Sequence, residues 1–336
     1  MRRTVKDYMV IGFKGMAMGA ADVVPGVSGG TIAFISGIYE ELLNSISNVN
    51  LDLLKTLKTA GFKSAWKQLN GNFLVSLFVG IFMSIISLAK VIKYLLENEP
   101  ILLWSFFFGL VLASIIFIAK QVTKWNFISV LVLFIGAFLA YFITTLNPLV
   151  SENSSLLFMF LAGAIAICAM ILPGISGAFI LVLLGAYKPV LEAVNDRDFK
   201  TVAVIGLGAI IGLLSFSKIL KWLFANYKNH TLATLTGFII GSLNKIWPWK
   251  LTETVFDKTA GQIIPFSSIS NLGTLSVYQK QIDNFETYKV ALEKSVLPFQ
   301  YSDANSINSQ LASVIIVALI GFGLIILMEK LAVKKQ

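Results

Sequence analysis

A short motif that occurs twice constrains the fold of this chain more than any other sequence feature. The first copy is Asp22-Val-Val-Pro-Gly-Val-Ser-Gly-Gly-Thr31, and a shortened copy, Leu172-Pro-Gly-Ile-Ser-Gly-Ala178, follows at an offset of 148 residues. From Pro25 to Tyr39, seven of fifteen positions are identical at this offset. Each copy lies between two apolar runs, so we expect its Pro-Gly pair to end one helix and its serine to cap the next. The motif therefore predicts an internal repeat.

The apolar runs around the motif are those of an integral membrane protein. The chain is 56% hydrophobic and only 13% charged, and its mean hydropathy is +0.79. Six runs approach the roughly 20 residues that a spanning helix needs. They are Phe73 to Leu96, Ile101 to Ala119, Phe127 to Leu146, Val202 to Phe224, Leu232 to Trp247 and Leu311 to Met328.

The segments beside each motif are too short to cross a bilayer comfortably. The apolar stretch before the first copy covers residues 8–24, and the run after it, Val27 to Tyr39, would give about 20 Å of helix. The second copy has the same form, with Leu156 to Leu172 before it and Ile175 to Tyr187 after it. Each copy is therefore either a re-entrant hairpin or one broken helix that crosses.

The distribution of charge favours the hairpin. If the first copy enters from and returns to the cytoplasm, the basic loops and the tail all lie inside, as the positive-inside rule requires. Glu97, Glu99, Glu152 and the long segment from Pro248 to Gln310 then lie outside. A crossing helix would instead leave four loop lysines outside. The basic residues concerned are Lys55, Lys58, Lys63, Lys67, Lys120, Lys124, Lys228, Lys330, Lys334 and Lys335.

A re-entrant hairpin does not cross the membrane, so each repeat crosses it three times. Because three is an odd number, the second repeat begins on the opposite side of the membrane and is inverted relative to the first. We therefore predict an all-α polytopic membrane protein of two inverted repeats, each a re-entrant helical hairpin plus three transmembrane helices. Repeat 1 covers residues 1–147 with its hairpin at 8–44, and repeat 2 covers residues 148–336 with its hairpin at 155–194. A second alignment supports this division, because at an offset of 128 Lys90, Lys93, Gly109 and Ser114 match Lys218, Lys221, Gly237 and Ser242.

Residues 249–308 form a polar insertion in repeat 2, rich in Ser, Thr and Asn. Apolar residues alternate weakly near Leu275 to Val277 and Pro298 to Tyr301. We interpret this insertion as an outward-facing extension, either a lid or an ordered loop.

The ends of the chain predict its location. Met1 to Lys6 is basic, but the apolar run after it is interrupted by Lys14 and Asp22, so we expect no cleavable signal peptide. The protein is expected in the cell (plasma) membrane as a multi-pass protein with both termini cytoplasmic.

The two motif turns are the best candidates for a binding site. Opposed hairpins would bring both Pro-Gly-x-Ser-Gly turns near the middle of the membrane, where helix N-termini and serine hydroxyls could hold a phosphate or carboxylate. Irregular backbone at that depth needs partners in the protein or in a water-filled cavity. The competing interpretation is that the glycines permit tight turns and the serines cap helices without any ligand.

Asp22 breaks the symmetry, since its counterpart at the offset of 148 is Met170. A carboxylate in an apolar stretch is costly and usually functional, so Asp22 is a candidate for coupling transport to protons. The alternative is a turn carboxylate bonded to nearby N–H groups.

Several lysines could guide an anion. Lys14 lies on the first half-helix, close to the motif, whereas Lys90, Lys93, Lys218 and Lys221 lie near helix ends. The pairs are explained by side chains that reach the membrane interface, so Lys14 is the better candidate for contact with an anionic head group.

Other chemistries are poorly supported. Gly26-Val-Ser-Gly-Gly30 matches G-x-S-x-G, but in soluble hydrolases that pattern sits on a strand-to-helix turn, and His230 is expected in a cytoplasmic loop. One cysteine and one histidine do not make a metal cluster. The net charge of +9 comes from dispersed residues, which fits topology and anionic lipid better than nucleic acid. We expect no enzymatic activity, no cofactor, no metal and no nucleic-acid partner.

The first motif is part of a longer run, Met18-Gly-Ala-Ala-Asp-Val-Val-Pro-Gly-Val-Ser-Gly-Gly-Thr-Ile-Ala-Phe34, followed by Gly37-Ile-Tyr-Glu40. With the later Leu172-Pro-Gly-Ile-Ser-Gly177, this run closely resembles the bacterial and archaeal family of polyprenyl-phosphate transporters. The resemblance covers about residues 8–248 and the last helix.

The resemblance implies a translocase that returns undecaprenyl phosphate from the outer to the inner leaflet for reuse in cell-envelope polymer synthesis. The partners implied are the lipid phosphate, the bilayer and protons as a candidate coupling ion. Asp22 would modulate affinity or coupling. The expected substrate-binding residues are Gly26, Ser28, Gly29, Gly30, Thr31, Gly174, Ser176, Gly177 and Lys14. The residues alone leave open an anion channel or a transporter of a small soluble anion, whereas a purely structural role fits the paired polar turns poorly.

Overall fold

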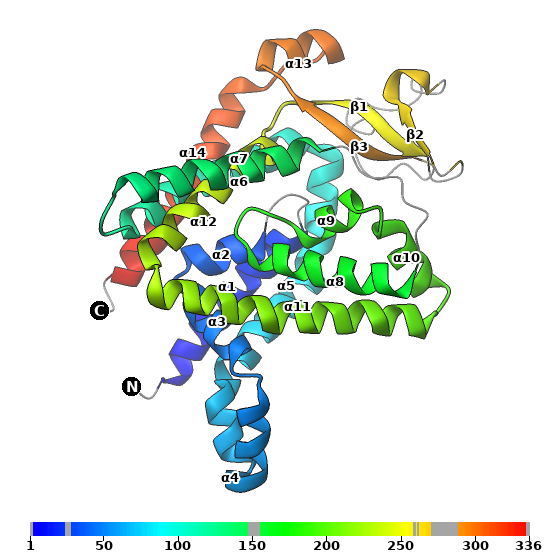
Figure 1. Cartoon of the computed structure of the whole chain (residues 1–336). Coiled ribbons are helices and arrows are strands. Elements are labelled where there is room, and N and C mark those ends of the chain that lie inside the picture. Colours follow the sequence, from blue (N-terminus) through cyan, green and yellow to red (C-terminus); the bar gives the residue numbers. More distant parts are fainter. Residues whose placement is uncertain are drawn as a thin grey trace.

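Helices form most of the chain, in the order expected for a repeated unit (Figure 1). The computed structural model describes residues 3–23, 28–146, 155–257, 260, 262–269 and 288–333. The helices of the first half are α1 (Val5–Val23), α2 (Gly29–Ile35), α3 (Tyr39–Ser47), α4 (Leu51–Leu69), α5 (Gly71–Asn98), α6 (Pro100–Gln121) and α7 (Phe127–Thr145).

The second half contains α8 (Leu156–Ile171), α9 (Gly177–Leu183), α10 (Tyr187–Asn195), α11 (Phe199–Asn226), α12 (Lys228–Ser242), the 3-10 helix η1 (Leu243–Ile246), β1 (Lys250–Asp257), β2 (Gln262–Pro265), the 3-10 helix η2 (Phe266–Ser268), β3 (Tyr288–Ser295), α13 (Pro298–Asn305) and α14 (Leu311–Val333). The expected boundary between repeats, 147/148, lies outside the described residues, as do Leu275 to Val277.

Four of the six expected spans are confirmed as helices long and apolar enough to cross a membrane. They are α5, through its first 18 residues, α6, α7 and α11. The last expected span corresponds to α14, whose apolar stretch in the described part is Leu311–Leu327. The expected span Leu232 to Trp247 corresponds to α12, which has 15 residues and begins earlier, at Lys228, and to the 3-10 helix η1 that follows it.

The surfaces of these helices are those expected in lipid. On α7, only Ser129, Gly136 and Ala140 are buried, while large apolar side chains such as Phe134 and Phe138 are each 65% exposed. An apolar surface of this kind is unusual in a water-soluble monomer. The molecule is therefore mostly helical and suited to a bilayer.

The two halves repeat the same elements. α1, a break, α2 and α3 correspond to α8, a break, α9 and α10. α5 and α11 each have 28 residues and begin at positions that differ by 128. Gly37 (φ 72°) and Gly185 (φ 70°), which align at the offset of 148, both take a left-handed conformation that favours glycine. The first half also contains α4, between α3 and α5, and the second half contains the sheet, between η1 and α14.

Helices are exchanged between the halves. α7 packs along α12, and α14 packs along α6. The repeated glycines Gly109 and Gly237 permit these crossings: a Cβ on Gly237 would overlap the carbonyl oxygen of Leu133 on α7, and a Cβ on Gly109 would overlap that of Ala318 on α14. Each half therefore relies on the last helix of the other.

The short helix α2 lies at the centre of the molecule (Figure 1). Six of its seven residues are buried, and Ile32, Phe34 and Ile35 belong to the large apolar core. The run expected as one helix over residues 27–39 is divided, because Gly37 turns the chain between α2 and α3.

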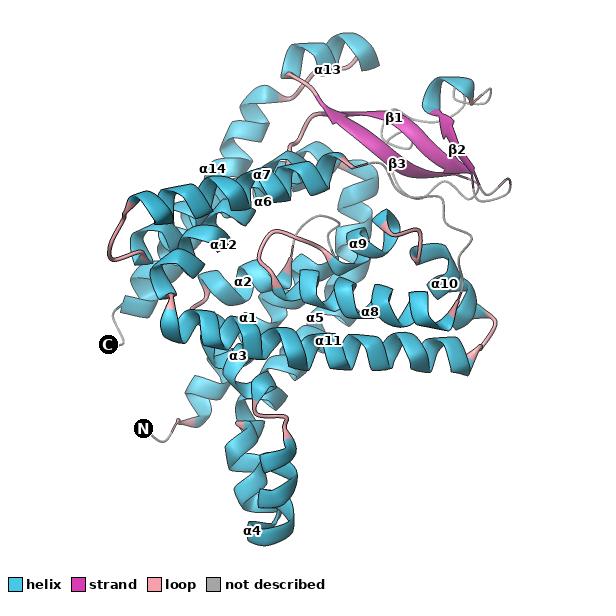
Figure 2. Ribbon diagram, in the orientation of Figure 1, coloured by secondary structure: helices cyan, strands magenta, loops and turns pink. Residues whose placement is uncertain are grey.

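The insertion contains a small antiparallel sheet in the order β2-β1-β3, seen in Figure 2 above the helices. The sequence did not reveal these strands. The weak apolar alternation near Pro298 to Tyr301 falls on the start of α13, with proline in its first turn. Tyr301 is fully buried there with Trp249 and Ile101.

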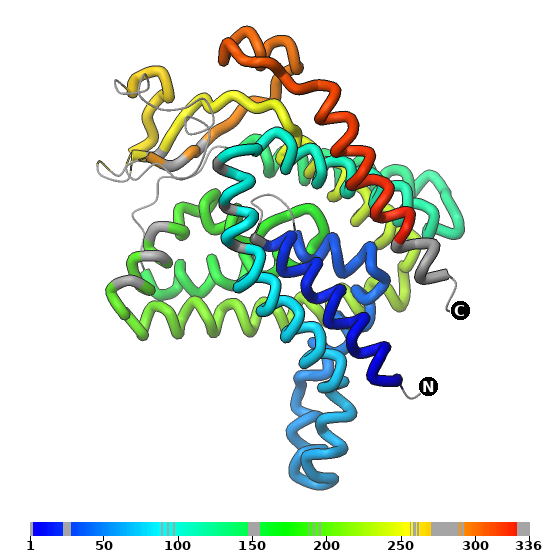
Figure 3. The backbone as a smooth tube through the Cα atoms, turned by 180° about the vertical axis from the view of Figure 1, so that it is seen from behind, coloured from blue at the N-terminus to red at the C-terminus, as the bar shows by residue number. Residues whose placement is uncertain are grey.

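The basic loops and the sheet lie toward opposite corners of the molecule. In Figure 1, α4 lies at the bottom, and both termini, the α6–α7 turn and the α11–α12 turn lie on the left, while the sheet and the α5–α6 turn lie toward the upper right and α10 lies on the right. Figure 3 gives the same arrangement from behind. α5 runs away from the α4 corner, and α11 runs back toward the side of the termini.

The α7–α12 crossing can be tested with Gly237→Ala. We expect the substitution to lower the free energy of unfolding by about 1–3 kcal/mol, because the methyl group forces the two helices apart. Thermal unfolding of the purified protein in detergent measures the change. Gly206→Ala on α11 is the matched control, since a Cβ there meets nothing within 4 Å and removing glycine from a helix stabilises it by up to about 1 kcal/mol. Equal stability of the two variants would contradict the close crossing.

Candidate functional site

The two motif turns, far apart in the sequence, lie against each other. The backbone N–H of Gly174 in the second turn donates to Thr31 Oγ1 in the first at 2.9 Å. The hydroxyl of Tyr39 donates to the carbonyl oxygen of Ile171 at 3.1 Å, and Ser28 Oγ lies 3.4 Å from that of Met170. The first turn thus supplies donors to carbonyls at the end of α8, which have no partners within their own helix. Pro25 and Gly26 lie outside the described residues.

The start of α2 is occupied by the protein's own acceptors. Ser28 is its N-cap, as the sequence predicted, and Ser28 Oγ accepts from the N–H of Gly30 at 3.1 Å. The N–H of Gly29 donates to Asp22 Oδ1 at 2.7 Å. Ser28 and Thr31 are 2% and 1% exposed. In this conformation, the anion at the start of α2 is therefore the carboxylate of Asp22.

The second turn is built differently. Ser176 is in the N-cap position of α9, but within the described residues its side chain makes no capping hydrogen bond. Gly174 has φ +88°, and a Cβ there would lie 2.7 Å from Ser242 Oγ on α12. Ser176 is half-buried and Gly177 is buried. Unlike the hydroxyl of Ser28, the hydroxyl of Ser176 therefore does not cap its own helix.

Lys14 is held away from the serine turns. Its ammonium group donates to the carbonyl oxygen of Ser36 at 2.6 Å, at the C-terminal end of α2, where a cation is favourable. Seven residues of helix, roughly 10 Å, separate this end from Ser28. The structure does not bring Lys14 together with the other candidate residues.

The lysine pairs also lie apart from the turns. Lys90 and Lys218 are exposed, and Lys221 donates to Ser47 Oγ on α3 at 3.3 Å. The side chain of Lys93 is outside the described part. Exposed lysines near helix ends fit side chains that reach the membrane interface.

Tyr39 is a residue of the site that the sequence analysis did not single out. Its ring is 3% exposed and lies 4.9 Å from that of Phe34 and 5.9 Å from that of Phe224 on α11, while its hydroxyl reaches the end of α8. The sequence signals were its identity with Tyr187 in the repeat and its place in the run Gly37-Ile-Tyr-Glu40.

The hydrolase interpretation finds no support in the contacts of the serine. Within the described residues, Ser28 Oγ contacts Gly30, Met170 and Leu172. His230 lies on the first turn of α12, with its ring 6.4 Å from that of Tyr227. No histidine therefore acts as a base for Ser28 in the part of the chain described.

Thr31→Val tests the contact between the turns. Valine keeps the shape but leaves the buried N–H of Gly174 without its acceptor, so we expect unfolding to become easier by about 1–3 kcal/mol. Thermal unfolding in detergent gives the measurement. Thr59→Val on exposed α4, where the hydroxyl bonds only within its own helix, should change stability by less than about 0.5 kcal/mol. A similar small effect at Thr31 would mean that the turns are not joined through its hydroxyl.

Comparison with known proteins agrees with the motif. Residues 18–264 match the model of a family described as VCA0040-like, undecaprenyl phosphate translocase-like. A polyprenyl-phosphate transporter of Vibrio cholerae is 44% identical over 328 residues, 98% of each chain. A polyprenyl-phosphate transporter of Staphylococcus aureus is 30% identical over 259 residues, 72% of this chain and 87% of that one. No solved structure matches. The chain belongs to the undecaprenyl phosphate translocase-like family.

Proposed function

We propose that this protein is a transporter, not an enzyme, that carries polyprenyl phosphate, with undecaprenyl phosphate as the expected substrate, from the outer to the inner leaflet of the plasma membrane. The observation that carries the proposal is the hydrogen bond between Gly174 and Thr31, which joins two broken helices at the centre of an apolar helical molecule. Relatives named polyprenyl-phosphate transporter support the choice of substrate.

The chemistry of such a lipid fits this arrangement. A polyisoprenoid tail is as apolar as the lipid around it, so only the phosphate must be shielded during crossing. Backbone N–H groups and hydroxyls at the two turns offer donors where the membrane provides none. We infer that the phosphate binds between the turns at Gly26, Ser28, Gly29, Gly30, Thr31, Gly174, Ser176 and Gly177. Lys14, at the far end of α2, acts on the site through α2 instead of touching the phosphate.

Asp22 gives this site a means of control. Its carboxylate accepts from the N–H of Gly29, a group that the phosphate would also use. Substrate and Asp22 therefore compete for one donor, and protonation of Asp22 would remove the competing negative charge. This competition supports Asp22 as the residue that couples transport to protons.

We propose that the halves, residues 1–147 and 148–336, are inverted repeats, each a re-entrant hairpin (8–44 and 155–194) with three spans. The matching order of elements and the exchange of α7 and α14 support this arrangement. Alternating access would then arise as one half moves against the other around the joined turns.

Both termini are cytoplasmic in this proposal. The corner that carries α4, the termini and the basic turns faces inward, because cytoplasmic loops are enriched in lysine and arginine. The insertion, residues 249–308, carries five lysines against six acidic residues and faces outward.

Binding of undecaprenyl phosphate to the purified protein tests the site. We expect the lipid to bind and a neutral polyprenol not to bind, since the turns recognise the phosphate. Ser28→Ala combined with Ser176→Ala should weaken binding by about tenfold or more, because two hydrogen bonds to a charged group are lost.

The control for that experiment is Ser64→Ala combined with Ser87→Ala, at exposed serines on α4 and α5, which should bind as the wild type does. Equal binding of the neutral polyprenol, or unchanged binding in the Ser28 and Ser176 variant, would overturn the phosphate site. The anion channel would then become the better explanation.

Cysteine labelling tests the orientation. In a Cys168→Ala background, we expect cysteines at Lys58 or Lys63 on α4 to be protected in intact cells from a thiol reagent that does not cross membranes. A cysteine at exposed Ala304 on α13 should react. Labelling at position 58 or 63 from outside would overturn the hairpin topology and the inverted repeat together.

A further inference from the structure

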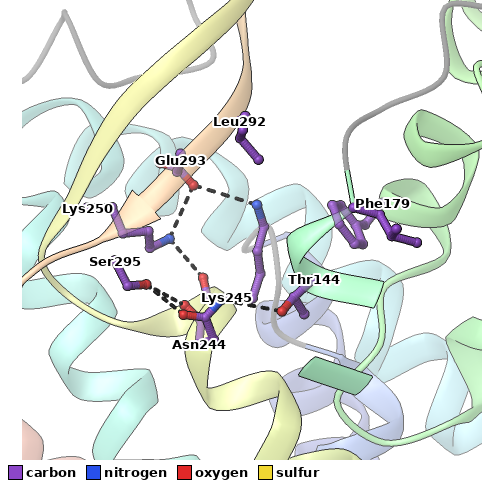
Figure 4. Close-up of a pocket in the computed structure, with 9 residues that line it drawn as sticks. Thr144, Phe179, Asn244, Lys245, Lys250, Leu292, Glu293 and Ser295 are labelled. Atoms are coloured by element: carbon purple, nitrogen blue, oxygen red, sulfur yellow. Dashed lines mark hydrogen bonds and ion pairs between the residues drawn. The ribbon is translucent and has the colours of Figure 1, made fainter. Parts of the chain in front are cut away.

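A second polar site lies between the sheet and the membrane helices. It is a small, partly enclosed cleft, shown in Figure 4. One wall is formed by β1 and β3, and the other by η1, the end of α7 and α9. The lining residues that matter below are Thr144, Phe179, Asn244, Lys245, Lys250 and Glu293. The sequence analysis singled out none of them.

Two cations in this cleft share one carboxylate. Glu293 Oε2 lies 3.4 Å from the Nζ of Lys250 and 3.6 Å from that of Lys245. Good charge-assisted hydrogen bonds are about 2.7–2.9 Å long, so both pairs are loose. Although burial alone would raise it, the pKa of Glu293 is lowered by the two lysines. The carboxylate is thus ionised near neutral pH, and the described residues that line the cleft include two lysines against one carboxylate.

The aromatic neighbours position these lysines. The ammonium of Lys250, whose side chain is 8% exposed, lies 4.2 Å from the centre of the Trp104 ring and donates to the carbonyl oxygen of Lys245 at 2.8 Å. Lys245 Nζ lies 5.0 Å from the ring centre of Phe179 on α9. Cation–π contacts of this kind fix a charge without neutralising it.

The sheet surface over the cleft is polar, although a sheet that covers helices normally presents apolar side chains. Lys250 pairs with Ser295 and Thr252 pairs with Glu293 across the strands. Thr252 Oγ1 is buried and has no hydrogen-bond partner among the described residues. Ser295 Oγ donates to Asn244 Oδ1 at 2.8 Å. Burial of polar groups such as these costs free energy unless they form hydrogen bonds with the protein or with a ligand.

The cleft lies at the end of an apolar surface. Phe138, Tyr141 and Phe142 on α7 are between 48% and 65% exposed, and Leu146, just beyond the end of α7, is 38% exposed and lines the cleft. A lipid tail could lie along α7 while its head group enters the cleft. Phe179, on the other wall, is two residues from Gly177 of the second turn.

From this geometry we propose that the cleft binds a phosphate monoester head group before it reaches the turns, with Lys245 and Lys250 as its ligands and Glu293 as the internal anion that it displaces. The proposal rests on the proposed function, in which the sheet faces outward. The apolar surface of α7 favours a lipid phosphate over free phosphate. Displacement of Glu293 would also break the ion pair between β3 and Lys245 of η1, while the hydrogen bond from Ser295 to Asn244 would still join these two elements.

Binding measurements on four single variants test this site, with undecaprenyl phosphate, inorganic phosphate and neutral polyprenol as probes. Lys245→Gln should weaken binding of undecaprenyl phosphate by about tenfold, and Lys245→Arg should restore most of it. Glu293→Gln should strengthen binding severalfold, because the competing carboxylate is gone. Lys294→Gln, at the exposed neighbouring position on β3, should leave it unchanged. Thermal unfolding checks that each variant is folded.

The outcomes separate this inference from the proposed function. Unchanged binding in Lys245→Gln, or weaker binding in Glu293→Gln, would mean that the ion pairs only fasten the sheet and would overturn the cleft site. If the Ser28 and Ser176 variant still lost binding in that case, the proposed function would stand. Absence of lipid binding to the wild type would overturn both. If inorganic phosphate bound as tightly as the lipid, the cleft would be a site for free phosphate, and the inference that it binds a lipid head group would be overturned.

Discussion

The need to pair polar backbone groups inside an apolar molecule governs this structure. Two helices break at its centre, and each break exposes N–H and carbonyl groups where lipid offers no partner. The first turn meets this need with Asp22, Ser28 and Thr31, and it also satisfies part of the second through Gly174. The buried helix α2 and the aromatic contacts of Tyr39 hold these groups together. A site that pairs its own donors so fully in one state must exchange partners in order to accept a phosphate.

Much of the membrane part could be predicted because it follows from hydropathy and local turn chemistry. Four spans lie where the apolar runs placed them, and Ser28 caps the helix after the first motif. The offset of 128 matched positions on α5 and α11, which have the same length. These features depend on residues close together in the sequence, or on a repeat that the sequence itself displays.

The features that the sequence did not reveal depend on contacts between distant segments. The strands β1 and β3 are separated by thirty residues, from Asp257 to Tyr288, and carry charged residues on the surface that they bury, so their pattern does not resemble that of a covering sheet. Lys14 was expected near the serine turn, but its long side chain reaches the opposite end of α2. Tyr39 stands in the repeat and in the quoted motif, but neither shows which group its hydroxyl contacts. In each case the direction of a side chain decided the outcome, and hydropathy says nothing about that direction.

The exchange of α7 and α14 between the halves has a consequence for synthesis of the protein in the cell. When α7 leaves the ribosome, its partner α12 is still about a hundred residues from completion, and α6 must wait longer for α14. During this interval the surfaces at Gly109 and on α7 face lipid or a membrane chaperone in place of their final neighbours. The first half is thus inserted as an incomplete structure, and the last helix to be translated closes the bundle.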